Sequence, residues 1–247
     1  MPHSIGQLTG INRYIVKSMA GEPLEQCKVE HYGLYGDRSH AFVDENESGW
    51  ERYITAREVP SLLGYEAHFE DSGDNTAGNV FPPVRITSRE NGQSFEWDMH
   101  LLQQLQGQSR RPMSLLRCTP SDDLLAVDAK AVLIVTDRTL KKLSEKLGRP
   151  IDPRRFRANF IVALSDDRFE EEQRLLGKRL RIGGAEMLVD EECERCSLIT
   201  LDPDNFARDK TVLRTVHEAF RLRFGVYASI AQPGLVKTGD SVWLLDE

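Results

Sequence analysis

Short runs of apolar and β-branched residues alternate with turn residues over almost the whole sequence, and this pattern limits the possible folds more than any other feature. A polar turn divides residues 39–55 into two such runs, and the pair Asn91 and Gly92 divides residues 84–97 in the same way. Both arrangements are typical of β-hairpins. Many short strands with few helices favour barrels or sandwiches over a doubly wound sheet. The sequence therefore predicts a mainly β fold with a few helices.

Two segments in the second half predict helices. After Thr136, which can cap a helix start, leucines spaced three and four apart share one face, and Gly148 ends the segment. A second helix is predicted over residues 210–223. Strands are predicted at residues 131–135, 159–164 and 197–202, in a hairpin around Gly183 and Gly184, and within residues 226–247.

The remaining segments suggest how the chain is divided. Residues 99–108 fit a short helix or a loop, and residues 71–79 are the stretch most typical of disorder, because they are polar, small and glycine-bearing. A polar crossing follows at residues 107–128. We place a domain boundary there, which predicts one domain over residues 1–118 and a second over residues 119–247.

Composition excludes several classes of protein. The 247 residues are 40% hydrophobic, which suits a globular protein with an ample core. No apolar run approaches the roughly 20 residues that span a bilayer, and the first residues lack the pattern of a signal peptide, so we expect a cytoplasmic protein. The net charge of −7 gives no general basic field, so we expect no nucleic-acid partner.

Cys193 and Cys196 form a Cys-x-x-Cys pair ahead of the run SLITLDPD. A redox dithiol places its first cysteine at a helix start, whereas this pair precedes a predicted strand. A structural zinc site needs four ligands, and the sequence has no second such pair. A single thiolate on a softer metal centre remains, beside the plain alternative of two unreactive thiols.

Basic residues occur at the ends of three predicted strands. Lys17 and Ser18 end the first, Arg38 lies in a Gly-Asp-Arg turn, and the run RFRANFIV places Arg157 and Asn159 at the start of another. Each alone is ordinary, because charged residues at strand ends are usually solvated. Together with the cysteine segment they are informative.

In order and spacing, these segments resemble the MOSC-domain proteins that carry a MOSC N-terminal β-barrel domain, the group that includes the mitochondrial amidoxime-reducing component and its bacterial relatives. The resemblance rests on IVKSMAGEPL, GLYGDRSHAFVDE and YITAREVPSLL in the first half. In the second half it rests on FRANFIV, ERCSLITLDPD, FGVY and VKTGDSVWLL. It implies an N-terminal β-barrel-like domain packed on a MOSC β-barrel domain.

The resemblance also implies a cofactor and the residues that bind it. In the family, a molybdopterin cofactor lies between the two domains and a cysteine thiolate binds molybdenum. The ligand position matches Cys196, and Cys193 is a neighbour with no implied role. The implied cofactor-binding residues are Lys17, Ser18, Arg38, Arg157, Asn159, Glu194, Arg195 and Tyr227. The cations suit a phosphate dianion, since arginine offers a planar fork of donors.

The implied activity is that of a molybdenum-dependent oxidoreductase that reduces small N-hydroxylated compounds, such as amidoximes and hydroxylamines, by two electrons. Asn205 and Phe206 stand where Thr-Gly often follows Asp-Pro-Asp, which leaves the substrate open. The sequence lacks the four-cysteine iron–sulfur motif of some larger relatives, so we expect a separate electron donor of flavin, iron–sulfur or cytochrome type. Two alternatives stay open: a carrier of molybdenum cofactor or persulfide sulfur, and a zinc-binding or structural β-barrel protein.

Overall fold

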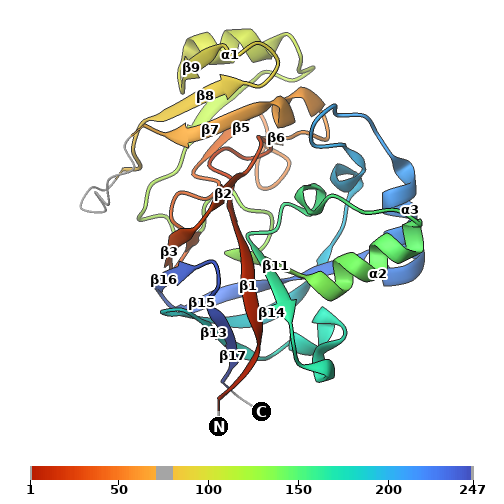
Figure 1. Ribbon diagram of the computed structural model, residues 1–247. Helices are drawn as coiled ribbons and strands as arrows, with labels where there is room; N and C mark the ends of the chain where they lie inside the picture. Colours follow the sequence, from red (N-terminus) through yellow and green to blue (C-terminus); the bar gives the residue numbers. More distant parts are fainter. Residues whose placement is uncertain (1, 71–79, 246–247) are drawn as a thin grey trace.

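The computed structural model describes residues 2–70 and 80–245. The predicted stretch 71–79 lies outside them. In the lower half of Figure 1, seven of the described strands close a β-barrel, because β1 pairs on both sides. In order round the barrel the strands are β1 (His3–Arg13), β12 (Phe160–Leu164), β11 (Val132–Thr136), β15 (Arg223–Gln232), β14 (Ala185–Glu194), β13 (Arg179–Ile182) and β17 (Ser241–Leu244). The predicted mainly β class is confirmed.

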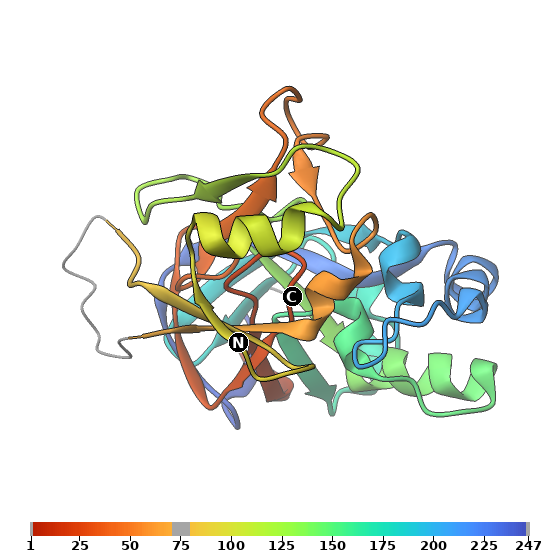
Figure 2. The ribbon, with the colours of Figure 1, turned by 90° about the horizontal axis from the view of Figure 1, so that it is seen from above.

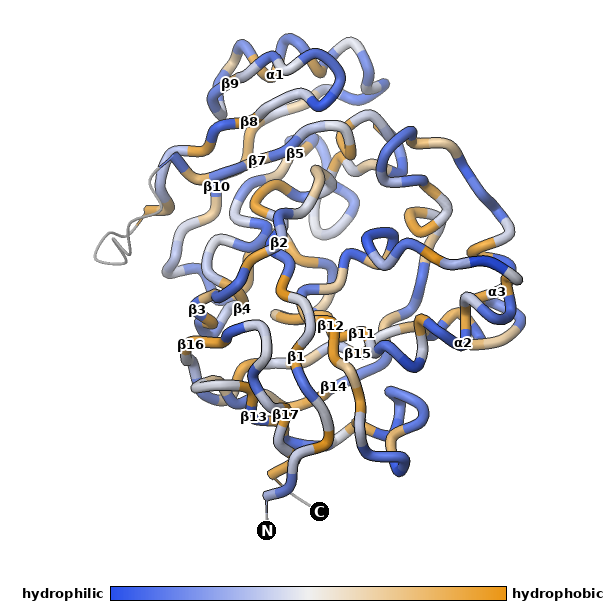
Figure 3. Tube along the Cα trace, in the orientation of Figure 1, coloured by the Kyte–Doolittle hydropathy of each residue, from blue (hydrophilic) through white to orange (hydrophobic). Residues whose placement is uncertain are grey.

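Apolar side chains fill the barrel. Ile5, Leu8 and Ile11 of β1 are buried in one core cluster with apolar residues of the other barrel strands, and Figure 3 shows hydrophobic colouring along β11, β12 and β15. Gly6 lets β1 and β12 approach closely, because a Cβ there would lie 2.2 Å from the carbonyl oxygen of Ala163. Barrel closure therefore depends on the first strand of the chain.

Helix α2 (Asp137–Leu147) joins β11 to β12, the parallel pair of the barrel. Thr136 caps its start by accepting a hydrogen bond from the backbone N–H of Thr139, and Gly148 ends it in the left-handed conformation at φ 68°. The predicted helix is confirmed. Helix α3 (Lys210–Phe220) packs beside it and ends three residues earlier than predicted, because Arg221 and Leu222 turn the chain into β15 with positive φ.

Smaller sheets complete the fold. One contains β5 (His40–Val43), β6 (Tyr53–Ile54) and β10 (Ser114–Arg117); another β7 (Tyr65–Phe69), β8 (Val84–Ser88) and β9 (Ser94–Glu96); a third β3 (Gln26–Glu30), β4 (Gly33–Leu34) and β16 (Gly234–Lys237). Strand β2 (Glu22–Leu24) extends the barrel sheet beyond β1. All three predicted hairpins form, as β5–β6, β8–β9 and β13–β14. Residues 99–108, left open between helix and loop, give α1 (Met99–Gln106), which lies at the top of the molecule in Figure 1 and faces the viewer in Figure 2.

The predicted strand over residues 197–202 is wrong. Ser197–Thr200 form a 3-10 helix, η5, and only Leu201 makes an isolated bridge, to Arg208. The β-branched composition suggested a strand. Instead, the Thr200 hydroxyl donates to the Ser197 carbonyl, and Arg155 donates to the Thr200 carbonyl from 45 residues away. These contacts satisfy backbone groups that a strand would have paired with a neighbour.

The two halves of the sequence share one sheet. Strand β1 lies between β12 and β17, so a segment of the predicted first domain completes the barrel of the second. The boundary at residues 118 and 119 stays a prediction. None of the helices in residues 2–70 and 80–245 is long and apolar enough to cross a membrane.

Candidate functional site

The structure brings all nine predicted site residues to one pocket, which both halves of the chain line. They are Lys17, Ser18, Arg38, Arg157, Asn159, Glu194, Arg195, Cys196 and Tyr227. The loops after β1 and β4 supply Lys17, Ser18 and Arg38, and the mouth of the barrel supplies the other six. Their individual roles remain predictions.

Three of these residues have a backbone conformation that residues other than glycine rarely adopt. Ser18, Arg38 and Arg157 lie in the left-handed region, with φ of 71°, 51° and 53°. Such conformations cost on the order of 1–3 kcal/mol each and gather at functional sites, where the surroundings enforce them. At all three the chain turns sharply at the edge of the pocket.

Lys17 is buried, and its ammonium is held in place by the chain. Its Nζ atom donates to the carbonyl of Ala126 at 2.8 Å and to the Asp128 carboxylate at 2.5 Å. Burial lowers the pKa of Lys17, and the negative charge of Asp128 opposes that shift. Partial enclosure by the protein acts to raise the pKa of Asp128, but the Lys17 ammonium outweighs it and the pKa falls to about 2, while the Asp128 side chain stays 56% exposed to solvent. This carboxylate thus occupies part of a cationic pocket.

Arg38 is fixed by a ring of acceptors. Its Nη1 atom donates to Asp37 and, at 3.1 Å, to Oδ1 of Asn159, while Nη2 donates to the carbonyl of Arg157. The same Oδ1 atom accepts the backbone N–H of Leu133, and the Asn159 amide nitrogen donates to the carbonyl of Asn12. Asn159 therefore joins strands β1, β11 and β12 and orients Arg38.

Two arginines of the pocket have guanidinium N–H donors without a hydrogen-bond partner among the described residues. Arg157 donates from Nη1 to the carbonyl of Met19 at 2.7 Å, and Arg195 donates to the carbonyls of Phe224 and Phe156 at 2.6 and 3.0 Å. In the described residues, Nη2 of Arg157 and Nη2 of Arg195 are buried and have no hydrogen-bond partner. Burial lowers the pKa of Arg157 to about 10, which leaves it cationic at neutral pH. Unpaired buried donors are costly, so this pocket favours an anionic, acceptor-rich ligand.

The two cysteines are not equivalent. Cys193, near the end of β14, is 2% exposed, and burial raises the pKa of its thiol. Cys196 is exposed and lies where β14 has ended and η5 begins. Tyr227 lies beside Cys193, and burial together with that thiol raises its pKa. Glu194 forms an ion pair with Arg223 at 2.8 Å. Only Cys196 thus presents an accessible sulfur to a ligand.

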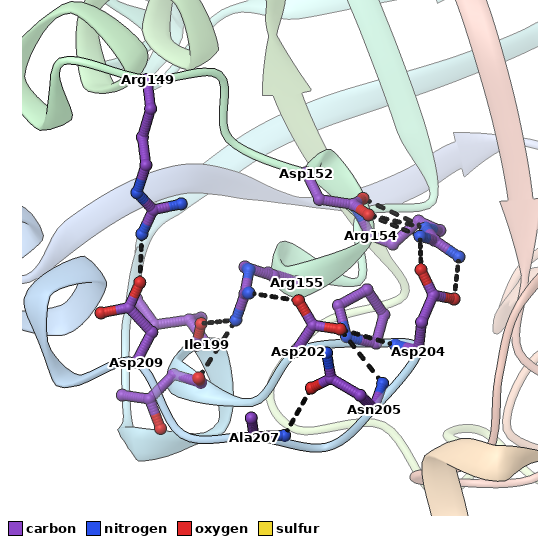
Figure 4. Close-up of polar contacts among 12 residues, drawn as sticks. Arg149, Asp152, Arg154, Arg155, Ile199, Asp202, Asp204, Asn205, Ala207 and Asp209 are labelled. Atoms are coloured by element: carbon purple, nitrogen blue, oxygen red, sulfur yellow. Dashed lines mark hydrogen bonds and ion pairs between the residues drawn. The ribbon is translucent and has the colours of Figure 1, made fainter.

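A polar network at the edge of the pocket contacts η5 (Figure 4). Arg155 is buried and donates to the carbonyl of Thr200 at 3.1 Å and to the Asp202 carboxylate at 2.8 Å. Arg154 forms ion pairs with both Asp152 and Asp204. These contacts tie the loop that follows Cys196 to the segment that carries Arg157.

Further residues that the sequence did not indicate line the same pocket. They are Trp50, Thr55, Arg57, Asp128, Lys130 and Arg155, with several apolar neighbours. The Arg57 guanidinium lies 4.0 Å from the Trp50 ring centroid at the rim. Arg57 falls within the segment YITAREVPSLL, whose match to the family was the available signal. Asp128 ends the polar crossing and Lys130 directly follows it, and composition assigned neither residue to a site.

Family models match most of the chain. The model of the MOSC N-terminal beta barrel domain matches residues 5–91, and that of the MOSC domain matches residues 121–243. The chain belongs to the MOSC-domain proteins that carry this N-terminal domain.

Relatives of this chain include both reductive and sulfur-handling proteins. Mitochondrial amidoxime reducing component 2 of Macaca fascicularis is 30% identical over 97% of this chain and 83% of its own length. Mitochondrial amidoxime-reducing component 1 of Mus musculus is 23% identical over 98% and 83%. A molybdenum cofactor sulfurase of Bombyx mori is 32% identical over 39% of this chain and 12% of its own length.

Proposed function

We propose that this protein binds the molybdenum cofactor and reduces small N-hydroxylated compounds, with Cys196 as the metal ligand. One observation carries the proposal: the unpaired buried donors of Arg157 and Arg195 line the same pocket as the exposed thiol of Cys196. That combination suits a ligand with both an anionic, acceptor-rich part and a thiophilic metal. The names of the relatives agree with it.

The residues present fit molybdopterin. Lys17, Arg38 and Arg157 would hold its phosphate, and the Arg195 guanidinium, fixed on two backbone carbonyls, would donate to its ring system. Asp128 would then share Lys17 with the phosphate. In the described residues no three His, Cys, Asp or Glu side chains converge as a metal site, so a single thiolate is what the chain itself offers a metal.

When bound, the cofactor supplies the two electrons that cleave the N–O bond of the substrate. The balance is R–NHOH plus two electrons and two protons, giving R–NH2 and water. The chain orients the substrate with the pocket wall that Trp50, Leu198 and Ile199 line next to Cys196. The electrons come from a separate donor protein.

The test compares Cys196→Ser with the matched variant Cys193→Ser, both purified from a host that makes the cofactor. We expect wild type and Cys193→Ser to contain molybdenum and pterin and to reduce benzamidoxime with a chemical reductant. We expect Cys196→Ser to lose the activity. Metal content far below one equivalent in every form, or equal activity in both variants, would contradict the proposal.

A second function, transfer of sulfur, is favoured by the exposure of Cys196 and by the sulfurase relative. Here Cys196 would carry a persulfide, and the pocket would present it to a cofactor. Mass spectrometry after incubation with a sulfur donor decides between the two. A stable persulfide at Cys196 together with no reduction of benzamidoxime by the cofactor-loaded protein would establish the carrier instead.

A further inference from the structure

A second hollow lies on the other side of η5 from the pocket. Ser197, Thr200, Leu213 and Leu222 line it, and four basic residues surround them: Arg208, Lys210, Arg214 and His217. We call it the α3 groove. Its lining includes no acidic residue. The groove therefore has an apolar floor and a basic rim.

Helix η5 is the wall between the groove and the pocket. Leu198 and Ile199 line the pocket, whereas Ser197 and Thr200 line the groove. The spacing explains this division, since residues three apart stack on one side of a 3-10 helix. Ser197 directly follows Cys196, and the Leu222 carbonyl accepts the backbone N–H of Arg195 at 2.8 Å. One helical turn thus separates the groove from the proposed metal ligand.

The basic residues are arranged on one face. Lys210, Arg214 and His217 lie four and three residues apart on α3 and are exposed. Among the described residues, no hydrogen bond or ion pair is found for the side chains of Lys210 or Arg214. The carboxylate of Asp209, at the helix start, is already engaged by Arg149. These charges are therefore available to a partner.

Charge complementarity defines that partner. The protein as a whole has a net charge of −7, so most of its surface repels an acidic protein. A local basic rim on such a molecule attracts an acidic partner to one place and orients it there. An apolar centre within a polar rim is also the usual anatomy of a protein interface.

We propose that the α3 groove is the docking surface for a small acidic one-electron carrier protein that delivers electrons through the η5 wall. The inference rests on the proposed reductase function. Two reduced donors each give one electron and are oxidised, while one R–NHOH and two protons become R–NH2 and water. The rate of electron transfer falls steeply with distance. A donor bound in the groove would be separated from Cys196 by a single turn of η5.

The test uses a reduced two-iron, two-sulfur ferredoxin of the plant type as the probe. The double variant Lys210→Glu with Arg214→Glu reverses two charges of the rim. Its matched control, Lys141→Glu with Lys146→Glu, makes the same change in net charge on exposed positions of α2. Binding is measured by calorimetry at low and high salt, and benzamidoxime reduction is driven either by ferredoxin or by reduced methyl viologen.

We expect the groove variant to bind ferredoxin about tenfold or more weakly at low salt, to lose ferredoxin-driven turnover, and to keep turnover with the viologen. The control should match wild type in all three. If wild type fails to bind the ferredoxin at low salt, or if both variants weaken it equally, the docking proposal is wrong. No viologen-driven turnover in cofactor-loaded wild type would instead remove the proposed reductase function.

Discussion

At the scale of single residues, the pocket is built from side chains whose surroundings set their chemistry. Cys193 and Cys196 differ in their surroundings, because burial raises the pKa of the Cys193 thiol while Cys196 is exposed. The sequence showed only a pair. The asymmetry was implied by the family resemblance, and the burial that the structure gives to Cys193 supplies a physical reason for it.

This difference predicts selective alkylation. In cofactor-free protein, iodoacetamide should modify Cys196 well before Cys193, since the accessible thiol reacts and the buried one does not. Peptide mass spectrometry over a time course measures both rates. Cofactor loading should protect Cys196 from alkylation. The substitution Cys193→Ser should leave the alkylation rate of Cys196 unchanged. Equal modification of both thiols in the folded protein would show that the burial of Cys193 is not maintained in solution.

At the scale of elements, local sequence patterns predicted what is determined locally. Hairpins at Asn91 and at Gly183, and the cap at Thr136, follow from residues within a few positions of one another. The 3-10 helix after Cys196 could not be predicted from nearby residues, because its conformation depends on Arg155, far away in the chain. The same holds for the pocket residues Asp128 and Lys130, which only the folded chain brings to the site.

A buried carboxyl group links two elements at the base of the site. Glu172 begins the 3-10 helix η4 (Glu172–Leu175) and is fully buried. Its carboxylate accepts the backbone N–H of Thr136 at 3.2 Å and that of Gly225. Burial raises its pKa to about 7 from an ordinary 4.5, although these N–H groups and Arg195 oppose the shift.

This group predicts a pH dependence of stability. Because the folded pKa exceeds the unfolded one, the folded state binds more protons between pH 4.5 and about 7, and the free energy of unfolding falls as pH rises through that window. The full span corresponds to about 3 kcal/mol. Urea unfolding of Glu172→Gln should show less of this slope than wild type, and a lower stability throughout, because an amide NH2 faces a backbone donor.

The exposed Glu170→Gln is the matched control and should keep the wild-type slope. A wild-type stability that is flat over this range, or a slope that Glu172→Gln retains in full, would assign the titration to other groups.

At the scale of the whole molecule, barrel closure joins the two ends of the sequence. Strand β1 pairs with β12 and β17, contacts between residues more than 140 positions apart, and no local pattern in the sequence indicates them. The mainly β class could be predicted from composition and turns, whereas the order of strands could not.

This pairing predicts the behaviour of fragments. Residues 119–247 expressed alone should aggregate, because without β1 the strands β12 and β17 leave unpaired edges and an open core. Adding residues 1–118 in trans should restore a soluble complex. Light scattering and circular dichroism measure both states. A monomeric, cooperatively unfolding 119–247 fragment would show that the second predicted domain folds without the first strand.

The register of β1 also constrains how the protein is made in the cell. His3 pairs with Leu244, so the barrel cannot close until the ribosome has added the intervening residues. At typical rates of synthesis this takes on the order of ten seconds or more. Until β17 emerges, β1 lacks one of the two barrel strands with which it pairs. Chaperones that bind extended apolar segments are therefore expected to hold β1 until β17 emerges.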